Sequence, residues 1–214
     1  MIRAWKAALA GLTLTVCAAT TAGAMTLDFD DLGFMSGDVV TGQTLLGITL
    51  SVANQGTTDG DPRELMLFDA ECGGDANNCS GGDEDLFAPG EGLVLIISED
   101  NDSADPDDSR FGGDIIFDFA EAVPVVSLLL DLDEGATVST LIGGVLIESV
   151  DLTTGNGGMT TVEFLMTDTA DQIVVSLNGS GAVASLTISP IPLPASLPMM
   201  LLAIGGLAAV RSRR

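Results

Sequence analysis

Carboxylates dominate the side chains of this sequence that could do chemistry. Asp and Glu supply 31 of its 214 residues, Lys and Arg supply seven, and His and Tyr are absent. Without histidine, nucleophilic triads lose their usual base and zinc sites lose their commonest nitrogen ligand. Oxygen ligands remain, and these suit a hard cation such as calcium. The residue types therefore favour cation binding over catalysis.

The acidic residues with the best placement for calcium lie in segments that interrupt apolar runs. Carboxylates gathered in loops between strands can offer a cation several oxygens at once. A solvated acidic surface that binds cations diffusely would have the same composition, and both interpretations remain open here. The candidate ligands are Asp30, Asp69, Asp83, Asp85, Asp107 and Asp108.

Two cysteines, Cys72 and Cys79, stand in the middle of the chain, separated by six residues. In an oxidising compartment this spacing predicts a disulfide that staples an acidic, glycine-rich loop. The alternative is a pair of metal ligands, but no histidine is present to complete a soft-ligand site. The third cysteine, Cys17, lies in the N-terminal segment.

Enzymes built from carboxylates alone are also compatible with this composition. Glycoside hydrolysis needs only two carboxyl groups at a set separation. With 31 acidic residues any pair could be nominated, so the sequence singles out no catalytic residue. We expect a non-catalytic protein.

The N-terminal residues have the pattern of an export signal. Arg3 and Lys6 precede the apolar run 7–19, and Ala22 and Ala24 then form an A-x-A cleavage pattern. We predict a signal peptide over residues 1–24, with cleavage after Ala24. The alternative, an uncleaved anchor, is disfavoured because spanning a bilayer takes ~20 apolar residues.

The C-terminal residues 190–214 combine three parts: a proline-rich motif, an apolar segment at 195–210 and an arginine-rich end. Prolines keep the first part extended, and terminal arginines favour the cytoplasmic side of a membrane. We expect the apolar segment to form a transmembrane helix. A plain C-terminal anchor is the alternative to a processed tail.

The motif Ile191, Pro192, Leu193, Pro194 and Ala195 resembles the VPLPA-type signature of PEP-CTERM sorting signals, with Ile in place of Val. The apolar run and closing arginines are similar too. This resemblance covers about 25 residues and concerns sorting alone. It implies an exported protein of a Gram-negative envelope, held briefly at the inner membrane. Its partner would be an exosortase-type membrane protease that cuts near the motif.

Between the two ends, residues 25–189 have the size of one domain. Of the seven basic residues only Arg63 and Arg110 lie there, against all 31 acidic ones, which gives a formal charge of −29. Nucleic acid and anionic lipid are excluded as partners, because clustered Lys and Arg bind both. Cations are the natural partners instead.

Short apolar or alternating runs recur through this domain, bounded by Gly, Asp, Asn and Ser. In 114–119, for example, Ile115, Phe117 and Phe119 fall on one face. The pattern predicts an all-β fold, an antiparallel β-sandwich with jelly-roll-like topology, flanked by a signal helix and a transmembrane helix. The acidic segments 69–91 and 99–108 are expected to project as loops. The predicted strands are 26–30, 45–52, 64–69, 93–98, 114–119, 124–131, 138–142, 145–150, 160–166, 172–177 and 183–189.

Three functions compete on these grounds. The first is a non-catalytic surface or matrix protein, stabilised by calcium and associated with exopolysaccharide or biofilm. The second is a calcium-dependent carbohydrate-binding module; the lack of Trp and Tyr from the domain counts against it, because such rings supply stacking platforms. The third is a carboxylate-based glycosidase or lyase.

Overall fold

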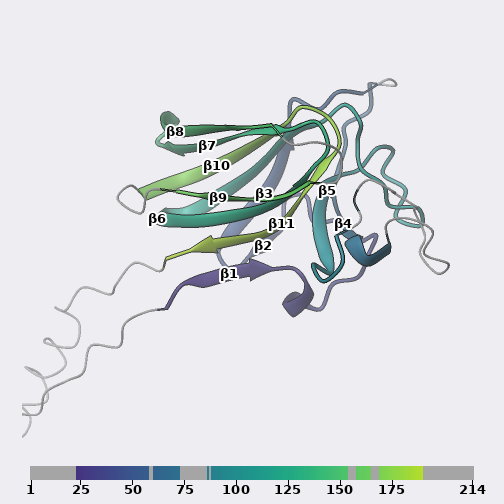
Figure 1. The fold of residues 1–214 in the computed structure, drawn as a ribbon, viewed down its shortest axis with the longest axis horizontal. Helices are drawn as coiled ribbons and strands as arrows, with labels where there is room; N and C mark the ends of the chain where they lie inside the picture. Colours follow the sequence, from purple (N-terminus) through teal and green to yellow (C-terminus); the bar gives the residue numbers. More distant parts are fainter. Residues whose placement is uncertain are drawn as a thin grey trace, which may run out of the picture. The chain divides into compact units, whose positions relative to one another are not determined.

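The computed structural model describes residues 23–57, 60–72, 86, 88–153, 158–164 and 169–189. Within them the chain forms antiparallel strands and two single-turn 3-10 helices (Figure 1), so the all-β expectation is confirmed. The elements are β1 (Met25–Asp28), η1 (Asp30–Leu32), β2 (Thr44–Leu45), β3 (Ile48–Ala53), β4 (Leu65–Asp69), η2 (Ala70–Cys72), β5 (Leu93–Ile97), β6 (Gly113–Leu132), β7 (Ala136–Ile142), β8 (Val145–Leu152), β9 (Gly158–Glu163), β10 (Thr169–Leu177) and β11 (Gly181–Ile188).

The long strand β6 divides the strands into two sheets. Its N-terminal half pairs with β3 and β10, and its C-terminal half pairs with β11 and β9. Sheet A contains β4, β5, β11, β1 and β9 with the second half of β6. Sheet B contains β2, β3, β10, β7 and β8 with the first half. The two sheets are therefore continuous through one strand.

The sequence predicts two strands where the structure has only β6. Pro124 accounts for the difference, because a proline inside an apolar run is usually a strand boundary. Here Pro124 pairs with Thr169 of β10, and Val125 already pairs with Ile188 of β11. Proline is tolerated because it lies where β6 exchanges one neighbour for another.

The predicted strand 45–52 differs as well. The chain reverses inside it at Leu46 and Gly47, whose φ angles are 52° and 85°. Two consecutive residues with positive φ form the tight turn that suits a two-residue hairpin. The segment is therefore the hairpin β2–β3, in which Thr44 pairs with Thr49.

The main hydrophobic core contains side chains from both sheets. Ile115 and Phe117 of β6 alternate with half-buried residues, as the period of two predicts, and both are fully buried. Leu128 and Leu130, farther along the same strand, join the same cluster together with residues of β5, β10 and β11. Full burial of each such side chain contributes about 1.5–3 kcal/mol.

A second, smaller cluster lies on the other face of sheet A. Met66 and Phe68 of β4 belong to it, whereas Leu65 and Leu67 between them belong to the main core. Ala70, Leu86 and Ala88 also belong to it, together with Val94 and Ile96 of β5 and Ala182 and Ala184 of β11. The described parts of segment 69–91 therefore pack on the sheet instead of projecting from it, because β4 and β5 are apolar on both faces.

Residues 23–191 form one compact unit. Several predictions concern residues outside the described part of the chain: cleavage residue Ala22, ligands Asp83 and Asp85, Cys79 of the disulfide, and the motif at 191–195. Ala24 lies directly before β1, and Cys72 ends η2. No helix among the described residues is long and apolar enough to cross a membrane. Both predicted flanking helices lie outside those residues.

Candidate functional site

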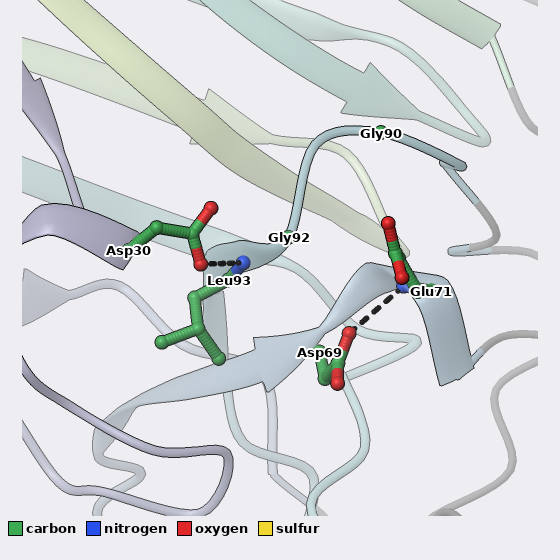
Figure 2. Close-up of a pocket in the computed structure, with 6 residues that line it drawn as sticks. All are labelled: Asp30, Asp69, Glu71, Gly90, Gly92 and Leu93. Carbon is green, nitrogen blue, oxygen red and sulfur yellow. Dashed lines mark hydrogen bonds between the residues drawn. The ribbon is translucent and has the colours of Figure 1, made fainter.

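A polar pocket of about 340 Å³ opens where η1, the end of β4, η2 and the start of β5 meet. Three carboxylates line it: Asp30, Asp69 and Glu71. Gly90, Gly92 and Leu93 supply the rest of its lining. Figure 2 shows Asp30 and Glu71 on either side of the Gly90–Gly92 turn. Three separate elements thus bring acidic groups to one concave surface.

Asp30 is held in place through both its carboxylate and its backbone amide. Its Oδ1 accepts a hydrogen bond from the Leu93 amide at 3.0 Å, and its own amide donates to Asp28 Oδ1 at 3.0 Å. Gly92 has φ of 62°, and a Cβ atom added there would collide with the Asp30 carboxyl group. A glycine is needed at Gly92 for this close approach as well as for its backbone conformation.

Asp69 and Glu71 are joined by the turn of η2. The Glu71 amide donates to Asp69 Oδ1 at 3.0 Å, and the Asp69 amide donates to Ser36 Oγ at 3.3 Å. The backbone between them is anchored to the opposite wall, because the Ala70 amide donates to the Gly92 carbonyl at 2.8 Å. The pocket walls are therefore tied together by main-chain hydrogen bonds.

The pocket offers hydrogen-bond acceptors and negative charge. Carboxylate oxygens can accept hydrogen bonds from hydroxyl groups or coordinate a hard cation. Within the described residues, no three His, Cys, Asp or Glu side chains lie close enough together to hold a metal ion. Asp30, Asp69 and Glu71 therefore share a pocket without converging on a single point. Asp83 and Asp85, predicted as further ligands, lie outside the described residues.

The other predicted ligands, Asp107 and Asp108, lie at the far end of β5. Asp108 forms a β-bridge with Ser98, directly after β5, whereas the pocket borders Leu93 at its start. Asp108 is 7% exposed. Its Oδ2 accepts hydrogen bonds from the Gly181 amide and, at 2.7 Å, from Ser180 Oγ. Asp108 thus anchors the start of β11.

Asp107, the residue before Asp108, has a different environment. Its Oδ1 is buried and has no hydrogen-bond partner among the described residues. Burial, together with repulsion from the nearby carboxylates, raises the pKa of Asp107 from 3.8 to about 6. Those carboxylates are Glu99, Asp100, Asp105 and Asp108. Ionised Asp107 therefore carries a charge that the fold itself does not compensate.

The structure brings together two of the predicted ligands, Asp30 and Asp69, and places Asp107 and Asp108 elsewhere. Sequence reasoning missed Glu71 and Gly92 as pocket residues. Glu71 follows Asp69 by two positions, but this spacing brings both side chains to the pocket only because η2 turns the chain there. Gly92 carries no sequence signal beyond being a glycine before an apolar run.

No protein-family model and no curated protein sequence matches the chain. Among solved structures, the lectin binding domain of Lectinolysin complexed with Lewis b is 11% identical with a TM-score of 0.38, covering 72% of this chain and 97% of that one. The family 32 CBM from C. perfringens NanJ, in complex with galactose, is 12% identical with a TM-score of 0.33, covering 70% and 96%.

Allantoicase from Saccharomyces cerevisiae is 8% identical with a TM-score of 0.37, and the match covers 66% of this chain but only 41% of allantoicase. Similarities of this size assign neither a ligand nor an activity to this chain. What the structure itself establishes is an antiparallel all-β domain with a polar, carboxylate-lined pocket at one end of β5.

Proposed function

We propose that this protein is an exported, non-catalytic polysaccharide-binding protein, and that its pocket accepts hydrogen bonds from sugar hydroxyl groups. The observation that carries the proposal is the pocket itself. Asp30, Asp69 and Glu71 reach it from three elements, and the Gly90–Leu93 backbone closes it. Its volume of about 340 Å³ is at the small end of the ~300–1,000 Å³ common for small-molecule sites, as a single sugar ring requires.

Carboxylates suit this ligand because they are acceptor-only groups when ionised, and each sugar hydroxyl carries a donor proton. Such charge-assisted hydrogen bonds are shorter and stronger than neutral ones. The formal charge of −29 on residues 25–189 disfavours a polyanionic glycan, because like charges repel. The ligand class that fits is therefore a neutral polysaccharide.

Calcium is the cofactor that we propose for this domain. The ionised form of Asp107 has a buried oxygen without a hydrogen-bond partner among the described residues. Four further carboxylates repel it, although no three acids in the described part of the chain converge into a ready-made metal site. A divalent cation would relieve that repulsion and satisfy the oxygen. The same ion type at Asp30 and Asp69 would bridge carboxylate and sugar oxygens.

Export and sorting complete the proposal. A cleaved signal peptide would direct the chain outward, and an exosortase-type protease would act at the Ile191–Ala195 motif. Delivery outside the cell would place the domain among exopolysaccharide or biofilm material. We also propose that its two sheets form a β-sandwich of jelly-roll-like topology.

Glycan-array binding of the isolated domain, residues 25–189, tests the function. We expect retention of neutral polysaccharides with calcium present and at least tenfold weaker retention for Asp69→Asn or Glu71→Gln, because each removes a charged acceptor from the pocket. Asp31→Asn is the matched control, since Asp31 is exposed in η1 and does not line the pocket. Equal retention by all four proteins would refute the pocket as the binding site.

Thermal unfolding tests the calcium proposal separately. Millimolar calcium should raise the Tm of the domain, and EDTA should lower it again, because a ligand that binds only the folded state stabilises it. Magnesium at matched ionic strength is the control. An equal shift with magnesium would mean charge screening without a specific site.

A further inference from the structure

Strand β8 forms one edge of sheet B, next to β7 (Figure 1). Within the described residues β8 pairs only with β7, so its other side presents unpaired backbone amide and carbonyl groups. Proteins usually protect such an edge with charged side chains, prolines or a covering loop. This edge is instead apolar at its N-terminal end.

The apolar residues concentrate at the β7–β8 hairpin. Ile142, Val145, Leu146 and Ile147 are four of the nine large hydrophobic side chains that are exposed in the described residues, and Val145 and Leu146 are 64% and 57% exposed. Scattered apolar residues on a surface are ordinary, whereas a contiguous group marks an interaction site. Nothing in the described part of the chain packs over this group.

The hairpin that carries these residues has a defined conformation. Gly143 and Gly144 both have positive φ, 56° and 76°, as a two-residue turn with the twist of the sheet requires. The Gly143 amide donates to Asp171 Oδ2 of β10 at 2.8 Å, which fastens the turn to the sheet. A preorganised surface of this kind binds without a large ordering cost.

We propose that β8 pairs with β8 of a second copy of this chain, in antiparallel fashion about a two-fold axis. Addition of a strand at an open edge satisfies the unpaired backbone groups, and a two-fold interface uses the same surface on both copies. The two B sheets would then form one continuous sheet across the dimer.

The charges of β8 exclude some registers of this pairing. In an antiparallel pair, two facing residues either both point their N–H and C=O groups at the other strand or both point them away. When a strand pairs with its own copy, the two-fold axis must therefore pass beside one residue, which then faces itself, and cannot pass between two residues. Centring on Glu148 or Asp151 places like charges opposite each other, which is destabilising. Centring on Ser149 places Glu148 opposite Val150, and centring on Val150 places Glu148 opposite Leu152, so neither register sets an acid opposite an acid. Of the two, only the Ser149 register sets Leu146 opposite another residue of β8, Leu152.

The Ser149-centred register also covers the apolar hairpin. The register between β7 and β8 shifts after Thr140, so Ile147 is an extra residue in β8 and the regular part of the strand begins at Glu148. Pairing about Ser149 therefore uses the regular part and leaves Leu146 alongside the C-terminal end of the second β8. There Leu152 is half-buried against the core, so the apolar side of Leu146 would meet an apolar neighbour.

Association is opposed by the formal charge of −29 on each copy of the domain. Surface repulsion of this kind is screened as ionic strength rises, over a Debye length of ~10 Å at 0.1 M salt. The dimer is thus expected at physiological or higher salt and not at very low salt. An interface held mainly by salt bridges would show the opposite dependence.

Sedimentation velocity of the domain across a salt series tests the proposal. We expect a monomer–dimer equilibrium that Leu146→Lys weakens at least tenfold, although the added lysine lowers the net negative charge. Met35→Lys is the matched control, because Met35 is 71% exposed outside this hairpin. Circular dichroism confirms that both variants fold. A monomer at every salt concentration, or equal weakening by both variants, overturns the proposal.

Ser149→Cys tests the register. Residues opposite each other in an antiparallel pair have Cβ atoms ~4.5–5.5 Å apart, so oxidation should link two copies through Cys at this position. Ser139→Cys, on the neighbouring strand β7, is the control and should remain unlinked beyond the wild-type level. Equal cross-linking of both variants would exclude pairing about Ser149.

Discussion

Two acidic regions at opposite ends of β5 have similar compositions and different roles. Asp30, Asp69 and Glu71 line an open pocket at its start, where two of the three side chains are exposed. At its end Asp108 is buried and bonded to Ser180 and Gly181. The comparison shows that the hydrogen-bond partners of a carboxylate, and not the local density of acids, decide whether it can bind a ligand.

Replacing Asp108 should have the largest effect on stability. Asp108→Ala leaves the Gly181 amide and Ser180 hydroxyl without their buried acceptor, and we expect a loss of about 2–4 kcal/mol in the free energy of unfolding. Urea denaturation measures it. Asp105→Ala, on an exposed residue of the same segment, should change stability by no more than ~0.5 kcal/mol. Similar losses for both variants would contradict the structural role of Asp108.

Replacing Gly92 should have the next largest effect, and at the pocket. Gly92→Ala forces a Cβ against the Asp30 carboxyl group and strains a residue at φ of 62°, which should cost about 1–3 kcal/mol. Gly90→Ala is the control, because its φ is 96° but no atom lies within 4 Å of the added Cβ. Glycan retention should fall only for Gly92→Ala. Equal effects would show that backbone strain alone is responsible.

Replacing Asp107 should have the smallest effect and a distinct pH dependence. Because the pKa of Asp107 is raised from 3.8 to about 6 in the folded protein, the folded state binds the proton more tightly than the unfolded state. Ionisation of Asp107 therefore lowers the free energy of unfolding, and this loss is complete above pH ~6. The loss disappears as the pH falls from about 6 to 3.8, where the carboxyl group becomes protonated in both states.

Asp107→Asn should accordingly stabilise the domain by about 1 kcal/mol at pH 7 without calcium, after allowance for solvent screening. It should have no such effect near pH 4. Urea denaturation at the two pH values provides the measurement. The same variant should reduce the calcium-induced rise in Tm. Stabilisation that is identical at both pH values would show that charge is not its cause.

The sequence predicts the strands well wherever one face is buried and the other is not. Ile115, Phe117 and Phe119 alternate with half-buried residues, and all three are buried as predicted. Prediction fails where tertiary contacts override a local signal. Pro124 lies inside β6 because the strand changes neighbours there. Leu46 adopts a positive φ, which the pattern of apolar residues does not predict.

The candidate site was predictable only in part, for a related reason. Residue type identifies acids as the chemistry of this chain, and Asp30 and Asp69 do share a pocket. Their grouping with Glu71 depends on a hydrogen bond across 63 positions, from the Leu93 amide to Asp30. The separate role of Asp108 depends on a contact across 73 positions with Gly181. The spacing of residues along the chain does not predict such long-range contacts.

The pairing of β1 with β11 has a consequence for how this chain reaches its native state. Met25 pairs with Ile188, and Thr26 Oγ1 lies 3.1 Å from Thr187 Oγ1, so the first and last strands are neighbours. Contacts between such distant positions slow folding, because a long loop must close first. Sheet A cannot be completed until β11 has emerged from the ribosome, and for the export that we propose this delay would keep the polypeptide extended enough to pass through a translocation channel.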